Sequence, residues 1–254
     1  MHKFLATSLF IGKPIIIMPN CHSTNDIASD LAQKGEIREG GVIYTDHQTR
    51  GKGQRGNRWE SEPGANLTFS VLFQPVFMTI EQQIYLNYKV SLSILDLLNQ
   101  LIPGKNTLVK WPNDIYVGDK KLGGILIENA LQGSKIRQSI VGIGLNINQM
   151  EFENQNAVSL SQISGQTYDL HDLLEKLLLH LESRYLQLKA GNLSRLKEEY
   201  LAHLYRKNEE HEFNIPASGK IRGKIIDVDE SGRLVIETVE GLKRFNFKEI
   251  EFMS

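Results

Sequence analysis

The chain has 254 residues, of which 41% are hydrophobic and 23% are charged, a composition that supports a full hydrophobic core and excludes a disordered chain. A formal net charge of −1 excludes a general attraction to nucleic acid, and no apolar run reaches the roughly 18 residues that a membrane-spanning helix needs. The single cysteine, Cys21, excludes a disulfide framework and a multi-thiolate zinc site within the chain, which suits a reducing, cytoplasmic compartment.

The first half of the chain is predicted to mix strands with two helices. The opening residues, 1–20, are interpreted as the first strands of the fold. The segment 23–35 begins with capping side chains and ends at a glycine, which predicts a short helix. Strands are predicted over 40–48 and 66–73, and a largely apolar helix over 84–101 is expected to pack against a sheet.

The second half is predicted to complete an α+β core and to add a small all-β domain. Strands are expected over 108–114, 115–131 and 139–148, with a tight hairpin turn at Gly118-Asp119. Apolar residues recur with helical period over 169–188 and predict an amphipathic helix that covers the sheet. From about His211 short strands alternate with turns, which favours an SH3-like β-barrel and two domains, 1–207 and 208–254.

A glycine-rich basic loop, GKGQRG at 51–56, matches the spacing of a dinucleotide-binding fingerprint. That fingerprint must open a helix, whereas Pro63, Gly64 and a strand follow here, so the match is interpreted as accidental. Four cations, Arg50, Lys52, Arg55 and Arg58, are crowded without an acid between 49 and 59. Because like charges repel, the loop is expected to order around a polyanion as a lid, and a solvated basic loop is the alternative.

The segment KWPND at 110–114 concentrates a second set of polar groups at a predicted corner between strands. Lys110, Asn113 and Asp114 offer donors and acceptors for phosphate, magnesium and an incoming group, and the hairpin brings Lys121 toward them. The alternative is that Asp114 caps a turn and Lys121 is a surface charge. Paired glycines in a strand, Gly123-Gly124, favour close approach of a ligand or another backbone. The run VGIGLNIN at 141–148 is interpreted in the same way.

Five segments in this order resemble the biotin–protein ligases: STN (23–25), QTRGKGQRGNRW (48–59), KWPND (110–114), KKLGGILIE (120–128) and VGIGLNIN (141–148). The resemblance implies a core with a mixed sheet and covering helices, of the fold shared with lipoate ligases. It implies that the carboxylate of biotin attacks the α-phosphorus of ATP, with Mg²⁺ on the leaving pyrophosphate, to give biotinyl-5′-AMP. A lysine of a biotin carboxyl-carrier domain, such as that of acetyl-CoA carboxylase, would then take the biotin.

The resemblance also implies roles for individual residues. The implied biotin-binding residues are Ser23, Thr24, Asn25, Gln48, Gly51, Lys52, Gly53, Gln54, Lys121 and Gly124. The implied ATP-binding residues are Arg55, Asn57, Trp59, Lys110, Asn113 and Asn146. The residues expected to act in catalysis are Lys110, Asp114, Lys121 and Arg55, and no side chains are predicted to form a metal site of the protein.

Two departures from the family pattern bear on function. The family's frequent loop form is GRGRRG, whereas Lys52 and Gln54 replace arginines here, so one charge-assisted contact of roughly 1.5–3 kcal/mol is lost unless Arg50 or Arg58 compensates. Only 22 residues precede Ser23, too few for the DNA-binding domain of some members. We therefore predict a monofunctional enzyme without specific DNA binding. A homodimer is one of the states the resemblance allows.

Two alternatives stay open from the sequence. A lipoate or octanoate ligase shares the fold, but it needs a long apolar channel rather than a polar pocket. A non-catalytic biotin or nucleotide sensor would not need Lys121, Asp114 and a lid together.

Overall fold

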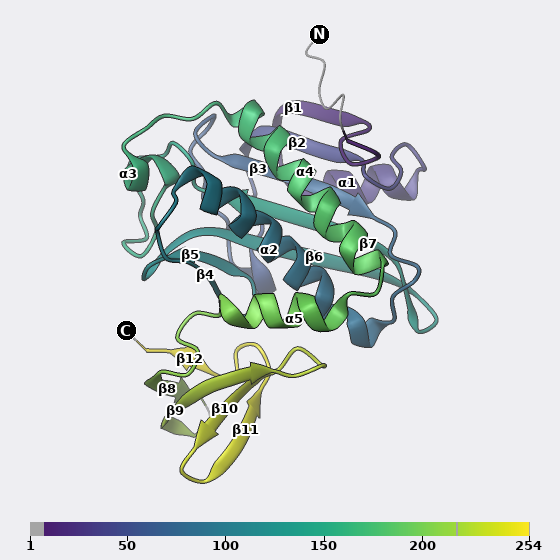
Figure 1. Ribbon diagram of the computed structural model, residues 1–254. Helices are drawn as coiled ribbons and strands as arrows, with labels where there is room; N and C mark the ends of the chain where they lie inside the picture. Colours follow the sequence, from purple (N-terminus) through teal and green to yellow (C-terminus); the bar gives the residue numbers. More distant parts are fainter. Residues whose placement is uncertain (1–7, 217, 254) are drawn as a thin grey trace.

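The computed structural model describes residues 8–216 and 218–253, apart from the side chain of Arg55. Its larger part is built on a seven-stranded sheet with the strand order β1-β2-β3-β7-β6-β5-β4 (Figure 1). β1 and β2 are parallel and the other neighbours are antiparallel, so the sheet is mixed, as expected. The strands are β1 (Ile15–Cys21), β2 (Val42–Gln48), β3 (Leu67–Phe73), β4 (Thr107–Lys110), β5 (Asp114–Val117), β6 (Lys120–Gln132) and β7 (Lys135–Leu145).

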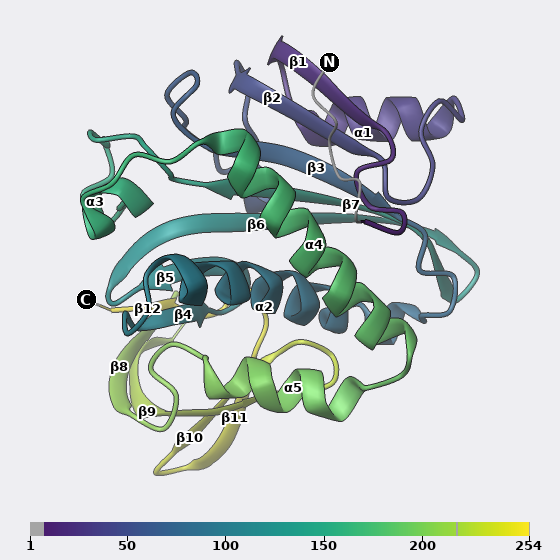
Figure 2. The same cartoon turned by 45° about the horizontal axis from the view of Figure 1, so that its top comes forward.

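Helices cover both faces of this sheet (Figures 1 and 2). The helices are α1 (Thr24–Gln33), α2 (Ile84–Leu101), α3 (Leu160–Ser164), α4 (Leu170–Lys189) and α5 (Leu193–Ala202), with short 3-10 turns at Gln54–Gly56 and Ile80–Gln82. α1 lies on one face, and α2 and α4 pack side by side on the other. α2 is buried on nearly all sides because it also contacts α5, which explains its largely apolar sequence.

Alternation along the strands assigns each side chain to a face. In β3, Leu67, Phe69 and Val71 join the large core under α2 and α4, whereas Leu72 joins a smaller cluster with Ala28 of α1. Neighbouring residues of a strand point to opposite faces, so the polar residues Thr68 and Ser70 share the α1 face. The fold therefore leaves a partly polar face next to the beginning of α1.

The C-terminal residues form a separate five-stranded antiparallel sheet with the order β11-β10-β9-β8-β12 (Figure 1). Its strands are β8 (Glu210–Ile215), β9 (Gly219–Val228), β10 (Leu234–Thr238), β11 (Gly241–Phe245) and β12 (Glu251–Phe252). The linker before it adds to the edge of the larger sheet, because Val109 N donates to His203 O (2.9 Å) and Tyr205 N donates to Val109 O (2.9 Å). The small sheet therefore lies beside β4, at one end of the polar face.

The structure differs from the sequence prediction at several places. Residues 8–14 form turns and bends, so the N-terminal strand begins only at Ile15, and residues 1–7 lie outside the described residues. The helices α3 and α5 were not predicted, and both are short, with 5 and 10 residues. Within the predicted all-β domain the chain leaves the sheet at 246–250, between its last two strands, and Asn246 N donates to the carboxylate of Glu249 there (2.7 Å). No described helix combines the length and hydropathy that a membrane crossing requires.

Candidate active site

A single row of directly paired residues crosses the polar face of the larger sheet. From β2 to β4 the row consists of Thr45, Thr68, Gly144, Gly124, Asp114 and Lys110. Residues directly opposite each other in neighbouring strands point to the same face, so the row forms a continuous floor. Gly144 and Gly124 form the middle of the row, and the carboxylate of Asp114 and the amine of Lys110 lie at its β4 end.

The glycines of the floor accommodate side chains of the protein itself. A Cβ on Gly144 would lie 2.5 Å from Cε2 of Trp59, and a Cβ on Gly142, one row away, would overlap Oδ1 of Asn25. The paired glycines predicted a close approach of a ligand or another backbone at these strands. The structure instead places the Trp59 ring directly on Gly144, where the ring becomes a wall of the space above the floor.

The beginning of α1 forms the polar end of this space. Ser23 caps the helix, as predicted, by accepting a hydrogen bond from Asp26 N (3.5 Å). Gln48 Oε1 accepts from Thr24 N (2.8 Å) and from Thr24 Oγ1 (3.2 Å). Because both lone pairs of this oxygen are used, Gln48 can offer a ligand only its amide nitrogen.

The side-chain amide of Asn25, which was predicted to bind biotin, is hydrogen-bonded to other residues of the protein. Its Nδ2 donates to Glu128 Oε2 (2.6 Å) and to Leu126 O (3.4 Å), and its Oδ1 accepts from Ser70 Oγ (2.6 Å). Both amide hydrogens are therefore used by the protein, and the amide oxygen accepts one hydrogen bond. Asn25 shapes this end of the space and holds α1 against the sheet.

The opposite end of the space is charged. Lys121 Nζ forms an ion pair with Asp114 Oδ1 at 2.7 Å, and both side chains are partly exposed. Lys110 Nζ instead donates to the hydroxyl of Tyr116 (3.1 Å). In the part of the chain that the structure describes, no carboxylate lies within ion-pair distance of Lys110.

Burial lowers the pKa of Lys110 from its ordinary value, and the positive charges of Arg206 and Lys121 lower it further, while Asp114 acts in the opposite direction. A half-buried ammonium without an acidic partner is an unfavourable arrangement for the protein alone. The site therefore favours an anionic ligand at Lys110, and Lys121 and Asp114 form a second, self-neutralised pair beside it.

The basic loop closes the space from above. Its backbone folds back on itself, because Gly53 N donates to Asn57 O (2.7 Å) and Trp59 N donates to Gly51 O (3.0 Å). Lys52 forms an ion pair with Asp26 in the first turn of α1. The loop is thus connected to α1 at one side and presents Trp59 to the floor at the other, whereas its ordering around a polyanion stays a prediction.

These elements enclose a cavity of about 220 Å³. Most of the predicted site residues line it, although they come from four separate segments of the chain. They are Ser23, Thr24, Asn25, Gln48, Lys52, Gly53, Gln54, Asn57, Trp59, Lys110, Asn113, Asp114, Lys121 and Gly124.

Three predicted residues are placed differently. Gly51 lines an adjoining hollow that shares Lys52, Gly53 and Asn57 with the cavity. Asn146 is buried next to the cavity without lining it, and its Nδ2 donates to Val158 O (3.3 Å). The side chain of Arg55 lies outside the described residues.

Asn113 lines the cavity, but its amide has a structural task. Asn113 Nδ2 donates to Ile125 O (2.6 Å), and Ile125 N donates to Asn113 O (3.0 Å). This reciprocal pair fastens the corner between β4 and β5 to β6. The corner in turn fixes where Lys110 and Asp114 stand.

Several lining residues were not predicted. Thr68 is 4% exposed, and within the described ranges its hydroxyl has no hydrogen-bond partner, as is also true of Trp59 Nε1. The alternating polar positions of LTFSVLF were an available signal for Thr68. The cavity is also lined by Trp111 and by residues of the small domain that no local pattern indicated: Phe247, Ile250 and Phe252.

A magnesium ion fits this site only together with a nucleotide. Among residues 8–216 and 218–253, no three His, Cys, Asp or Glu side chains are grouped as a metal site. Mg²⁺ is commonly held by one or two carboxylates plus phosphate oxygens of the substrate. Asp114 is the one carboxylate among the described residues that line the cavity, which matches such a shared arrangement.

Comparison with known proteins agrees with this geometry. Residues 18–146 match the family model described as "Biotin/lipoate A/B protein ligase family", and residues 214–253 match "Biotin protein ligase C terminal domain". The chain belongs to the biotin/lipoate A/B protein ligase family. The two matches fall on the two sheets of the structure.

Alignments with individual relatives cover most of the chain. The biotin–[acetyl-CoA-carboxylase] ligase of Mycobacterium tuberculosis is 30% identical over 218 residues, which are 85% of this chain and 80% of the relative. The bifunctional ligase/repressor BirA of Bacillus subtilis is 29% identical over 249 residues, 95% of this chain and 74% of the relative. The structure of biotin protein ligase from Aquifex aeolicus in complex with biotin and ATP superimposes with a TM-score of 0.77 at 29% identity, covering 95% of this chain and 99% of that one.

Proposed function

We propose that this chain activates biotin with ATP to biotinyl-5′-AMP and transfers the biotin to a lysine of a biotin carboxyl-carrier protein. One observation carries the proposal: a single cavity joins a polar end at the beginning of α1 to a charged end with two lysines and one carboxylate. Family members named as biotin ligases, one of them with biotin and ATP bound, support it.

The polar end suits the bicyclic head of biotin. A ureido ring needs both donors and acceptors, and the hydroxyls of Ser23 and Thr68 line this end of the cavity, whereas the hydroxyl of Thr24 already donates to Gln48 and accepts from Ser70. The Thr68 hydroxyl is buried and unpartnered among the described residues, so a bound polar ring would remove the cost of that buried group. Gln48 contributes its amide nitrogen, and Asn25 positions the helix start.

The charged end suits the first chemical step. The carboxylate of biotin, bound with its head near α1, points along the floor toward Lys121, which holds and orients it for attack on the α-phosphorus of ATP. Lys110 neutralises charge on the phosphate oxygens, and its lack of an acidic partner keeps it available for them. Mg²⁺ bound to the nucleotide supplies charge neutralisation at the leaving pyrophosphate.

Asp114 serves the second step. The incoming lysine must approach the mixed anhydride and lose a proton. Asp114 lies on the floor directly opposite Gly124, and its carboxylate is partly exposed. This carboxylate can therefore accept a hydrogen bond from the amine. Trp59 covers part of the floor and the loop lies over the cavity, and both limit the access of water, which would hydrolyse the intermediate. Asn57, Asn113 and Arg55 are proposed to contact the nucleotide, and Asn146, which does not line the cavity, is proposed to support the cavity wall.

The wider setting is part of the proposal. The carrier is a biotin carboxyl-carrier domain, the compartment is the cytoplasm, and magnesium accompanies ATP. The absence of specific DNA binding and a homodimeric state stay predictions.

The first experiment measures the intact mass of a purified biotin carrier domain after incubation with this protein, ATP, magnesium and either biotin or lipoate. An ATP-dependent gain of one biotinyl group on one lysine is expected. A lipoyl gain would assign the protein to the lipoate branch of the family, and no gain with retained biotin binding would indicate a sensor. Lys121→Ala should abolish adenylate formation with the fold intact, and an undiminished rate would remove the role of Lys121.

A further inference from the structure

The ammonium group of Lys110 is surrounded by aromatic rings from three parts of the chain. Its Nζ lies 4.9 Å from the ring centroid of Tyr116, 5.8 Å from that of Tyr205 and 4.9 Å from that of Phe252. Tyr116 belongs to β5, Tyr205 to the linker between the domains and Phe252 to β12 of the small domain. Rings within about 6 Å attract a cation through their negative faces.

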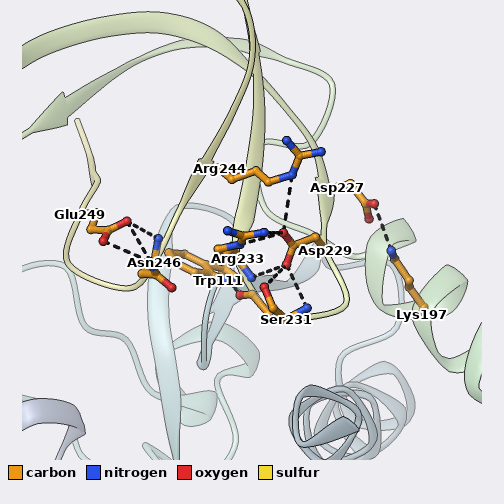
Figure 3. A network of polar contacts seen from close by, with 10 residues as sticks. Trp111, Lys197, Asp227, Asp229, Ser231, Arg233, Arg244, Asn246 and Glu249 are labelled. Atoms are coloured by element: carbon orange, nitrogen blue, oxygen red, sulfur yellow. Dashed lines mark hydrogen bonds and ion pairs between the residues drawn. The ribbon is translucent and has the colours of Figure 1, made fainter. Parts of the chain in front are cut away.

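Two contacts at the domain interface set the position of this cage. Trp111, next to Lys110 in the chain, donates from Nε1 to Gly232 O at 3.0 Å (Figure 3). The turn that carries this carbonyl is rigid, since Asp229 accepts hydrogen bonds from Ser231 N (3.0 Å) and Arg233 N (3.0 Å). The ion pair of Lys197 in α5 with Asp227 (3.0 Å) holds the same sheet to the helices (Figure 3).

The ring of Phe252 is itself fixed from two sides. Phe252 is paired with Phe213 across the small sheet, and their rings meet edge to face at 5.6 Å between centroids. The next residue, Met253, accepts a hydrogen bond from Arg206 Nη1 (2.6 Å) through its carbonyl. Phe252 also lines the cavity, so the small domain determines the position of one side chain of the site.

We infer that the C-terminal domain completes the nucleotide site by supplying Phe252 as one wall of an aromatic cage around Lys110. The inference rests on the proposed function, in which Lys110 binds the phosphates of ATP. A lysine side chain has four flexible bonds, so an unsupported ammonium would spend much of its time away from the phosphates. The cage shields the ammonium from water on the sides of the rings and leaves it directed at the cavity, where the attraction to phosphate is stronger than in bulk water. Phe252 is thus a positioning residue.

The test compares Phe252→Leu, which keeps an apolar side chain without the ring, with Phe252→Tyr, which restores a ring. Ile236→Val is the matched control, because Ile236 is fully buried in the same small domain and is not one of the rings around Lys110. Affinity for a non-hydrolysable ATP analogue is measured by calorimetry with saturating biotin. Affinity for biotin and the thermal unfolding midpoint are measured on the same samples.

Phe252→Leu is expected to weaken binding of the ATP analogue by about twofold to thirtyfold, with biotin affinity unchanged. Phe252→Tyr should recover most of the lost affinity. Ile236→Val should lower the unfolding midpoint without weakening the binding of the analogue. Equal weakening by Phe252→Leu and Ile236→Val would overturn the inference, because loosening of the domain would then suffice. Wild-type affinity in Phe252→Leu would overturn it directly.

The same samples separate this inference from the proposed function. If the wild-type protein binds the analogue with the expected dependence on Phe252 but adds no biotin to the carrier, the proposed function fails and the cage stands. If the carrier is biotinylated and Phe252→Leu has no effect on the analogue, only the cage is wrong. If the wild-type protein does not bind the analogue, both are wrong.

Discussion

Replacing Gly144 by alanine tests whether Trp59 forms a wall of the nucleotide site. A Cβ at this position would lie 2.5 Å from Cε2, 2.7 Å from Cζ2 and 2.9 Å from Nε1 of Trp59. Ordinary carbon contacts are at about 3.5–4.0 Å, so the ring must retreat by about 1 Å. The backbone of Trp59 is held by its hydrogen bond to Gly51 (3.0 Å), so the side chain has to swing away from the floor.

The size of the effect follows from this overlap. Overpacking of this kind costs about 1–3 kcal/mol, which corresponds to a roughly 5- to 150-fold loss if the displaced ring contributes to nucleotide binding. We expect Gly144→Ala to raise the KM for ATP within this range and to change the KM for biotin less. The matched control is Gly124→Ala, the directly paired residue of the same floor. There a Cβ would meet Trp59, Asp114 and Lys121 at 3.6 Å, which is an ordinary contact.

The assay is pyrophosphate release at varied ATP and varied biotin, with thermal unfolding as a check on the fold. The chain has two tryptophans, so Trp59 is observed alone in a Trp111→Phe background, where Gly144→Ala should increase quenching of its fluorescence by acrylamide. A wild-type KM for ATP together with changed quenching would show that Trp59 moves but does not serve the nucleotide. Equal effects of Gly144→Ala and Gly124→Ala would refute the steric argument itself.

Three further predictions concern Gly142 and two buried charged side chains. In Gly142→Ala the new Cβ would overlap Asn25 Oδ1, so biotin binding should weaken about 5- to 150-fold, whereas ATP binding should change less. Titration of each ligand measures both affinities. Lys89 is fully buried, and desolvation lowers its pKa well below 10.5, so the unfolded state binds the proton more tightly and stability rises with pH toward 10.5. Lys89→Met should therefore raise the free energy of unfolding by about 1–3 kcal/mol at pH 7 and flatten this pH dependence in urea titrations; a loss of stability would contradict the reasoning. Burial alone would raise the pKa of Glu182, but hydrogen bonds from the backbone N–H groups of residues 9–11 lower it below its ordinary value of 4.5. Its stabilisation is thus complete above about pH 4.5 and is lost as the pH falls through the lowered pKa. Glu182→Gln should cost about 1–3 kcal/mol at pH 7 and make acid unfolding less steep, and equal acid sensitivity of the two proteins would count against it.

Local sequence determined the elements of the fold. The helical period over 169–188 and the apolar run over 84–101 coincide with α4 and α2 because the period of burial is set by helix geometry alone. The same holds for the capped start of α1. Where the signal is weak, as in α5 with two fully buried residues, the prediction failed.

Short segments also indicated most of the cavity lining. Fourteen of the predicted residues line one cavity, since each lies in a segment whose glycines, corner or cap already restricted its direction. The distant partners of these residues were not visible. The predicted hairpin already brought Lys121 toward Asp114, but the hydrogen bonds of Asn25 with Ser70 and Glu128 depend on how α1 packs on the sheet and not on any local pattern.

The sequence by itself thus determined the secondary structure, the α+β class and the family resemblance, because periodicity, caps and turns act over a few neighbouring residues. Only the tertiary structure decided that Trp59 rests on Gly144 and that Phe252 faces Lys110. Lys110 and Phe252 are 142 positions apart in the chain and belong to different sheets. Their contact depends on how the two domains dock, and docking is set by the summed packing of the whole interface, which no local segment encodes.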